Sequence, residues 1–495
     1  MGDILVTSIW NRIMIVNFGF PALPVGLLIA LRYLLSPLSL YAGFRSDTTS
    51  FLGMKRTSYI WLGRALMVAS FPLLGFSITL FDANKNDALG WIVACLSFLL
   101  YGTGTLLSGS PFLALVRDAM PKARQGIALS TVETALILCF AFVGISFSLF
   151  LKEYSLTGFW ELIAVTAIVG GFFWVFGIAG VEKGALIQKA AEHTKETTRA
   201  QFQEFRATFT KIWQDARARA FMYFLIVAMI AAWAQEVILE PFGAQVLGAT
   251  LEQTTRYSSY WQSGTAIILI FFALAYRIRN RRLHWLIAAI GLGLLGLGRG
   301  VLGVTTLAIL GIVIDPAWIG IGIGATLLSF GLFSVLAEKF WRERRAEHQA
   351  PISKIGLAIM GIGMVWLALT ALTGIRWMVN PALLVFGIGF GFYTFSAFQL
   401  LVVMTSDRAA GAYLGLWTVT ILLSRGLGFV AGSALRDGLY ALTQSYPLAY
   451  GITFGLEALG LFVSILLLAR VNIIGFARDT GRIAAADAQV IAGDV

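Results

Sequence analysis

The sequence predicts an all-α protein that crosses a membrane many times, because of its hydropathy, its long apolar segments and its distribution of basic residues. The chain has 495 residues, of which 58% are hydrophobic and only 13% are charged, and its mean hydropathy is +0.80. A soluble domain cannot bury this much apolar surface. Apolar stretches of about 18 or more residues are typical of transmembrane helices. We therefore expect a single polytopic membrane domain.

The apolar stretches number about fourteen by this length criterion. They are continuous rather than alternating, which favours helices. In chain order they cover residues 4–20, 22–43, 58–80, 90–115, 126–151, 158–181, 219–247, 257–276, 284–312, 317–338, 354–374, 380–405, 411–435 and 447–470.

Basic residues test this count, since cytoplasmic loops of membrane proteins are enriched in Lys and Arg. With the N-terminus inside, alternate loops carry clusters of Lys and Arg, the largest between residues 182 and 219. An even number of spans with both termini cytoplasmic follows. The opposite loops hold only Lys85, Lys152, Arg256, Arg376 and Arg436.

A weak internal repeat predicts two homologous six-helix halves. Residues 118–126 and 407–411 both begin with Asp, contain Arg and Gly, and open a long span from the inner side. The second half is longer, and we assign the excess to an inserted hairpin. The expected organisation is an N-terminal half (1–181), a linker (182–218), a C-terminal half (219–472) containing the hairpin 284–338, and a cytoplasmic tail (473–495).

The linker contains a predicted amphipathic helix on the inner side of the membrane. Two interpretations are open, a solvated connection between the halves and a surface for regulation or partner binding. Its apolar residues recur at helical spacing, namely Phe202, Phe205, Phe209, Ile212 and Trp213.

Charged side chains inside the spans are the candidates for function, since each costs about 2.5–3.5 kcal/mol at the bilayer centre and needs a partner or a purpose. Structural ion pairs explain them as well as a functional site does. Glu133 and Glu236 are the candidates for a proton relay. Others within spans are Arg32, Arg299, Arg425 and Glu457, with Glu240 and Arg436 nearer the outer ends.

Polar and aromatic residues of spans one, seven and eight complete a candidate cavity or pigment site. Asn17, Gln235 and Glu236 belong to spans that line the central cavity of a two-half transporter. Trp233 and Trp261 lie mid-span, where tryptophan either packs or stacks against a flat ligand.

Several functional classes have no support in the sequence. The three histidines lie in or beside inner loops, and Cys95 and Cys139 lie inside apolar segments without metal-ligand spacing. No phosphate-binding loop, zinc motif or Ser-His-Asp arrangement is present. We therefore predict no enzymatic activity, no ATP-driven pumping and no metal site. We also predict no nucleic-acid binding, although the net charge is +11.

The loop after span two resembles a conformational lock. Gly43, Asp47, Lys55 and Arg56 are similar to the loop between spans two and three of the major facilitator superfamily. There, the acidic and basic residues hold neighbouring helices together on the inner side. The resemblance implies the fold of that superfamily.

Longer segments resemble the PucC-like family, the bacteriochlorophyll-delivery group of that superfamily. The segments are 11–22, 46–48, 56–63, 235–248 and 432–438. Members usually have glutamate where this chain has Asn17. The resemblance implies a membrane protein that handles (bacterio)chlorophyll transiently, with no tightly bound cofactor, and assists assembly of light-harvesting or reaction-centre subunits.

Two other functions stay open at this point: a proton-coupled secondary transporter of a small amphipathic solute, and a non-transporting assembly scaffold that keeps the transporter fold. All three place the protein among membrane lipids. The expected location is the bacterial cytoplasmic or intracytoplasmic photosynthetic membrane.

Overall fold

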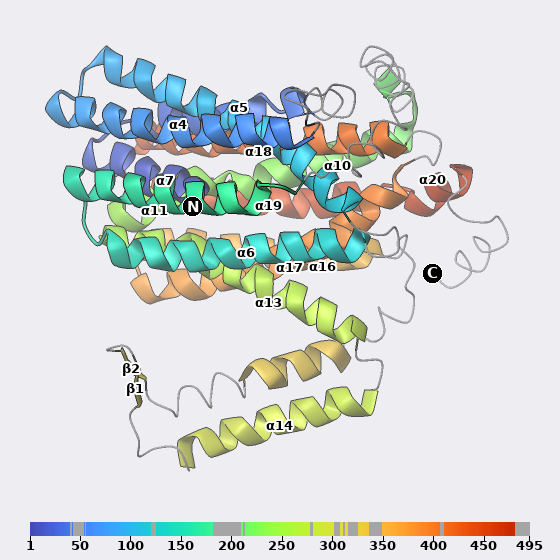
Figure 1. Cartoon of the computed structure of the whole chain (residues 1–495). Coiled ribbons are helices and arrows are strands. Elements are labelled where there is room, and N and C mark those ends of the chain that lie inside the picture. Colours follow the sequence, from blue (N-terminus) through green and yellow to red (C-terminus); the bar gives the residue numbers. More distant parts are fainter. Residues whose placement is uncertain are drawn as a thin grey trace.

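The computed structural model describes residues 1–39, 42, 54, 56–119, 125–181, 209–210, 213–277, 281–300, 307–309, 312–314, 325–335, 349–405 and 410–480. Long helices lie side by side in one bundle, and the chain begins within that bundle rather than at one of its ends (Figure 1). The all-helical membrane architecture predicted from the sequence is confirmed.

The N-terminal half begins with a short helical span and continues with the further helices of this half. Residues 2–17 form three consecutive pieces, the last two of them π-helical, which together are shorter than the other spans. The elements are α1 (Gly2–Ile4), η1 (Leu5–Trp10), η2 (Ile13–Asn17), α2 (Ala22–Leu34), α4 (Arg56–Ala83), α5 (Ala88–Asp118), α6 (Gln125–Phe150) and α7 (Leu156–Ile178).

The C-terminal half repeats this plan with an insertion. Its elements are α10 (Ala216–Trp233), α11 (Gln235–Gln245), α12 (Leu251–Thr255), α13 (Tyr257–Arg277), α14 (Arg281–Gly300), β1 (Leu307–Ile309), β2 (Ile312–Ile314), α16 (Ala350–Thr373), η5 (Arg376–Met378), α17 (Val379–Val403), α18 (Ala410–Thr443), α19 (Tyr446–Ala469) and α20 (Ile473–Asp479).

The two halves meet through two pairs of helices. α2 packs against α18, and α6 packs against α13. If the inserted segment is left out, these are the second and fifth helices of one half against the fifth and second of the other. Exchanging the halves turns one pair into the other, as expected for a two-fold pseudo-symmetric pair of repeats.

Close backbone contacts hold the helices of each half together. At Gly387 of α17, an added Cβ would lie 1.8 Å from the carbonyl oxygen of Trp261. Only glycine allows α13 and α17 to approach this closely, which is how small residues act at helix contacts in membranes.

The predicted count of about fourteen spans is not confirmed. Within the described residues, ten helices are long and apolar enough to cross a membrane. Shorter apolar helical stretches cover Ala135–Phe150 and Ala325–Val335. The first predicted span, 4–20, corresponds to the short helical segment 2–17.

The inserted hairpin differs from the two full spans predicted at 284–312 and 317–338. The helix Ala325–Val335 lies between α13 and α14 at the edge of the bundle (Figure 1). In the chain between α14 and this helix, Leu307 pairs with Ile314 in an antiparallel ladder. β-branched Val and Ile in 312–314 favour strand over helix. Phe330 and Phe333 anchor the second helix on Phe271, at ring distances of 5.3 and 5.7 Å.

α18 is longer than the predicted span 411–435 and continues to Thr443. Arg436, expected in an outer loop, therefore lies inside a helix. It is only 4% exposed, and its burial is compensated because Asp437 lies beside it with an Nη1–Oδ1 distance of 2.6 Å.

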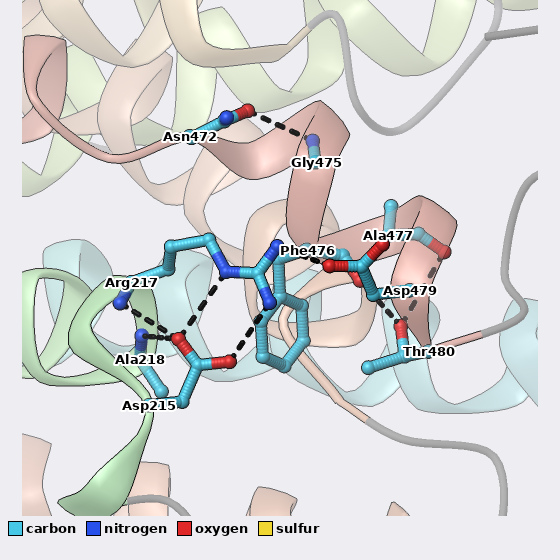
Figure 2. A network of polar contacts seen from close by, with 9 residues as sticks. All are labelled: Asp215, Arg217, Ala218, Asn472, Gly475, Phe476, Ala477, Asp479 and Thr480. Atoms are coloured by element: carbon cyan, nitrogen blue, oxygen red, sulfur yellow. Dashed lines mark hydrogen bonds and ion pairs between the residues drawn. The ribbon is translucent and has the colours of Figure 1, made fainter.

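A polar network fixes the C-terminal helix α20 to the start of α10 (Figure 2). Asp215 caps α10 by accepting from the backbone amide of Arg217 at 2.8 Å. The Arg217 guanidinium contacts Asp215 at 3.0 Å and Asp479 of α20 at 2.7 Å. Asn472 caps α20 by accepting from the amide of Gly475.

We expect this network to weaken in acid. Burial alone would raise the pKa of Asp215, but its hydrogen bonds from Arg217 and the Ala218 amide outweigh that effect and lower the pKa below its ordinary value of 3.8. A carboxyl whose pKa is lowered by folding stabilises the fold above its unfolded pKa, and this stabilisation disappears as the pH falls through the folded pKa. The Asp215→Asn variant should melt at a lower temperature than wild type at pH 7.

The difference should be small, below about 1 kcal/mol, because these side chains are partly exposed, and it should shrink progressively as the pH falls below 3.8. Thermal unfolding of both proteins across pH 3–7 measures it. Asp479→Asn removes a more exposed carboxylate and serves as the comparison. It should lower the melting temperature by less than Asp215→Asn does. A difference that stays constant with pH would contradict this account.

Candidate binding site between the two halves

An arginine in the middle of α18 lies among aromatic rings from both halves. The Arg425 guanidinium carbon is 3.4 Å from the ring centroid of Trp233 and 4.5 Å from that of Tyr33 on α2. Trp261 is 5.8 Å from Trp233, ring to ring. The predicted mid-span tryptophans are therefore neighbours, and Phe390 packs against both of them.

The aromatic contacts do not offset the cost of placing this charge in the membrane. A cation over an aromatic face gains about 0.5–2 kcal/mol, whereas a charge at the bilayer centre costs about 2.5–3.5 kcal/mol. Within the described residues no carboxylate lies within 4.0 Å of the Arg425 guanidinium. Its Nε is buried and has no hydrogen-bond partner.

α11 brings two polar side chains to the same region. Gln235 and Glu236 follow Trp233 almost directly and are 1% and 7% exposed. Neither amide atom of Gln235 has a partner, and the same is true of Glu236 Oε2. Buried polar groups without partners are rare because each costs about 1–3 kcal/mol. Such a cluster is typical of a site that is completed by a ligand or by water.

An ion pair between a buried arginine and a partly exposed carboxylate borders the site on the N-terminal half. Arg32 of α2 pairs with Asp3, and Tyr101 of α5 donates its hydroxyl to Asp3 Oδ1 at 2.6 Å. The Arg32 guanidinium also lies 4.4 Å from the ring of Tyr33. Three helices are thus joined around one carboxylate, and the guanidinium groups of Arg32 and Arg425 both lie against the Tyr33 ring.

Helix α11, which contains Pro241, is held by the first span. Pro241 has no N–H, so the carbonyl of Val237 lacks its usual helical donor. The side chain of Asn11 supplies that donor at 2.6 Å. One turn away, Ser258 donates to Glu240 Oε1 at 3.2 Å, and its oxygen lies 3.1 Å from that of Ser8. Glu240 is therefore part of a polar contact between the halves.

A second contact between the halves lies at the start of α2. The Asp437 carboxylate accepts from the backbone amides of Ala22 and Leu23 at 3.0 and 2.7 Å. These amides have no partner inside their own helix. Arg436 donates to Gln245 and Tyr450, so α2, α11, α18 and α19 meet here. We call this group of contacts the Asp437 junction.

The other predicted site residues lie elsewhere or outside the described part. Asn17 is the exposed last residue of η2. Glu457 of α19 is 3% exposed, with neither carboxylate oxygen hydrogen-bonded. Glu133 lies in α6, and its side chain is outside the described residues.

The predicted lock loop falls largely outside the described residues, which exclude Gly43, Asp47 and Lys55. Arg56 begins α4 and donates to the carbonyl of Ala114 in α5 at 2.9 Å. It joins two neighbouring helices of the N-terminal half.

The sequence matches one protein family over nearly its whole length. The family described as PUCC protein matches residues 9–346 and 331–476. The chain belongs to the PUCC protein family. The family resemblance seen in the sequence is confirmed, and it includes the segments that form the Asp437 junction and the Arg425 site.

Two relatives of this PUCC protein are proteins of Rhodobacter capsulatus. One, named bacteriochlorophyll synthase 44.5 kDa chain, of Rhodobacter capsulatus, is 26% identical and covers 94% of this chain and 90% of its own. Protein PucC of Rhodobacter capsulatus is 25% identical, covering 93% and 87%.

Solved transporter structures share the fold of the PUCC protein. The inward open xylose transporter XylE from E. coli superposes with a TM-score of 0.56 at 11% identity, covering 95% of this chain and 94% of that one. At this identity the likeness shows the fold alone. It confirms that the predicted helical bundle has the fold of this transporter.

Sequence reasoning on this PUCC protein did not select several residues of the site. Asp3 was not identified as the partner of Arg32 because it precedes the first predicted span. Tyr33 and Tyr101 were not selected because they carry no charge. Arg425 was recognised as an embedded charge but not as a site residue. The signal that could have found it is its position within a span that carries no acidic residue within a helical turn of it.

Proposed function

We propose that this protein handles (bacterio)chlorophyll within the membrane and assists assembly of light-harvesting complexes, without catalysing a reaction. The observation that carries the proposal is the family match over residues 9–476. Two relatives carry the names PucC and bacteriochlorophyll synthase chain. The proposed location is the cytoplasmic or intracytoplasmic photosynthetic membrane, with both termini cytoplasmic.

The chemistry of the interior supports this proposal. A (bacterio)chlorophyll is a flat conjugated ring, and such rings stack on aromatic side chains. Trp233 and Trp261 meet at 5.8 Å with further rings around them. The central Mg²⁺ of such a pigment prefers oxygen ligands. The side-chain oxygen of Gln235, which has no hydrogen-bond partner, is of this type. A single weak ligand suits transient handling better than storage.

The test is deletion of the gene in its host, followed by absorption spectra of the membranes and pigment analysis of the purified protein. We expect weaker antenna bands, restored by the wild-type gene, and pigment that co-purifies with the protein. Trp233→Leu should retain roughly two- to tenfold less pigment, the value of one aromatic contact. Trp377→Leu, at a tryptophan that is 70% exposed, is the matched control.

Buried carboxylates favour a second candidate, proton-coupled transport of a small amphipathic solute. Glu236 and Glu240 lie one turn apart on α11, at the contact between the halves. Unchanged antenna bands after deletion would reject pigment handling and leave transport. Reduced bands with no co-purifying pigment would instead favour a scaffold that binds antenna subunits.

A further inference from the structure

Three aromatic rings are exposed where the linker enters α10. The ring of Trp213 stacks on that of Phe209 at 6.0 Å, with an interplanar angle of 21°, and meets the ring of Tyr223 of α10 edge-on at 6.3 Å. The three residues are 42%, 41% and 49% exposed, respectively. Exposed apolar groups that lie together in this way are typical of a surface that contacts a membrane or another molecule.

An arginine lies beside these rings. Arg219 precedes Tyr223 by four residues and therefore shares its face of α10. Its Nη1 donates to the backbone carbonyl of Trp213 at 3.2 Å, in an exposed hydrogen bond that holds the end of the linker against this face. Among the described residues no carboxylate lies within 4.0 Å of its guanidinium. The remaining N–H groups of the fork can therefore donate to an anion.

The position of these side chains is that of a boundary between membrane and water. The apolar span Ala216–Gln245 begins here, and both Arg219 and Tyr223 lie near its beginning. Exposed tryptophan and tyrosine at the end of a span are typical of the level of the lipid headgroups. The sequence 199–219 carries more basic than acidic residues, which favours an anionic lipid surface.

The neighbouring charges indicate which headgroup fits. Arg217 pairs with Asp215 at 3.0 Å and with Asp479 at 2.7 Å. Both carboxylates are therefore already engaged, which leaves neither for the ammonium group of a zwitterionic headgroup. A headgroup with a net negative charge carries no such cation, and its phosphate matches the planar fork of Arg219.

We propose that the Trp213 face, made of Phe209, Trp213, Arg219 and Tyr223, is a binding site for an anionic phospholipid. The three rings lie among the headgroups and the first acyl carbons, and the guanidinium of Arg219 binds the lipid phosphate. The end of the linker is then anchored on the membrane rather than solvated. This inference is independent of the proposed function, because it involves none of the residues of the interior site.

Quenching by brominated phospholipids tests the Trp213 face in the purified full-length protein. Gln214, which is exposed beside Trp213, is replaced by cysteine in a background without Cys95 and Cys139 and carries a fluorophore. Brominated phosphatidylglycerol should quench this label at about fivefold lower concentration than brominated phosphatidylcholine, the value of one basic residue near an anionic surface. High salt should reduce the preference, because salt screens an exposed charge.

Substitutions in the labelled protein separate the charge from the rings. Arg219→Gln should remove the preference, and Arg219→Lys should retain part of it because lysine keeps the charge without the fork. Trp213→Leu should weaken the binding of both lipids alike. The matched control is Arg376→Gln, at an exposed arginine beside the exposed Trp377 at the start of another helix, and it should change neither affinity.

Thermal unfolding of each variant confirms that it is folded. Equal quenching by the two lipids in the labelled parent protein, or a preference that survives in Arg219→Gln, would overturn the anionic site. A label that neither lipid quenches would show that the Trp213 face does not contact lipid. That result would overturn the whole inference in favour of a solvated linker or a protein partner.

Discussion

Replacing Asp437 with asparagine should lower the free energy of unfolding by about 3 kcal/mol, the scale for breaking a buried ion pair. Asparagine keeps the shape but loses the charge that binds both Arg436 and the amides of Ala22 and Leu23. Arg436, with 5% of its side chain exposed, would keep only neutral partners. Thermal and denaturant unfolding in detergent measure the loss.

The same change should also open the contact between α2 and α18. Ser433 is fully buried there, against Gly26. A cysteine at Ser433, in a background without Cys95 and Cys139, should react several-fold faster with a water-soluble maleimide when Asp437 is replaced. This readout separates opening of the Asp437 junction from a general loss of stability.

Asp87→Asn is the matched control for the Asp437 change. Asp87 also accepts a backbone amide at a helix start, from Leu89 at 2.9 Å, but at the exposed end of α5 and without an arginine partner among the described residues. It should cost less than about 1 kcal/mol and leave labelling at Ser433 unchanged. Equal effects of the two substitutions would show that the Asp437 junction has no special role.

The family segments found in the sequence lie far apart along the chain and meet in space. Asn11 and Ala22 come from the first segment and bond across the contact between the halves, to Val237 and Asp437. Gln245 from 235–248 accepts from Arg436 of 432–438 within the C-terminal half. Pattern recognition could find each segment, because each has distinctive residue types. It could not pair them, because pairing depends on how one half packs on the other.

Predictions failed where local sequence does not determine helix length. Hydropathy placed the fold and most helices correctly, and it put Trp233 and Trp261 in spans that bring the two rings together. It ended α18 at residue 435 because Arg436 and Asp437 are charged, although their mutual pairing allows the helix to continue. The hydropathy pattern also predicted two full spans in the hairpin 284–338, because hydropathy cannot distinguish a short apolar strand pair from a helix.

Replacing Arg32 with glutamine should lower the free energy of unfolding by about 1–3 kcal/mol, less than for a fully buried ion pair because 30% of the Asp3 side chain is exposed. Arg32 is 4% exposed, and removing it leaves Asp3 with the Tyr101 hydroxyl as its remaining side-chain partner among the described residues. Glutamine fits the space, which is limited because Gly102 of α5 lies directly against the Arg32 backbone. Thermal unfolding of the purified protein is the measurement.

The double variant Asp3→Asn/Arg32→Gln decides whether this loss comes from the stranded charge or from lost packing. If charge dominates, neutralising Asp3 should recover more than half of the loss, since replacing a buried ion pair by neutral groups is often close to neutral. If packing dominates, the double variant should be no more stable than Arg32→Gln, and the ion pair would then have no net stabilising role. Because Asp3, Arg32 and Tyr101 come from three helices, a large recovery would identify one carboxylate as the group that fixes the first span against α2 and α5.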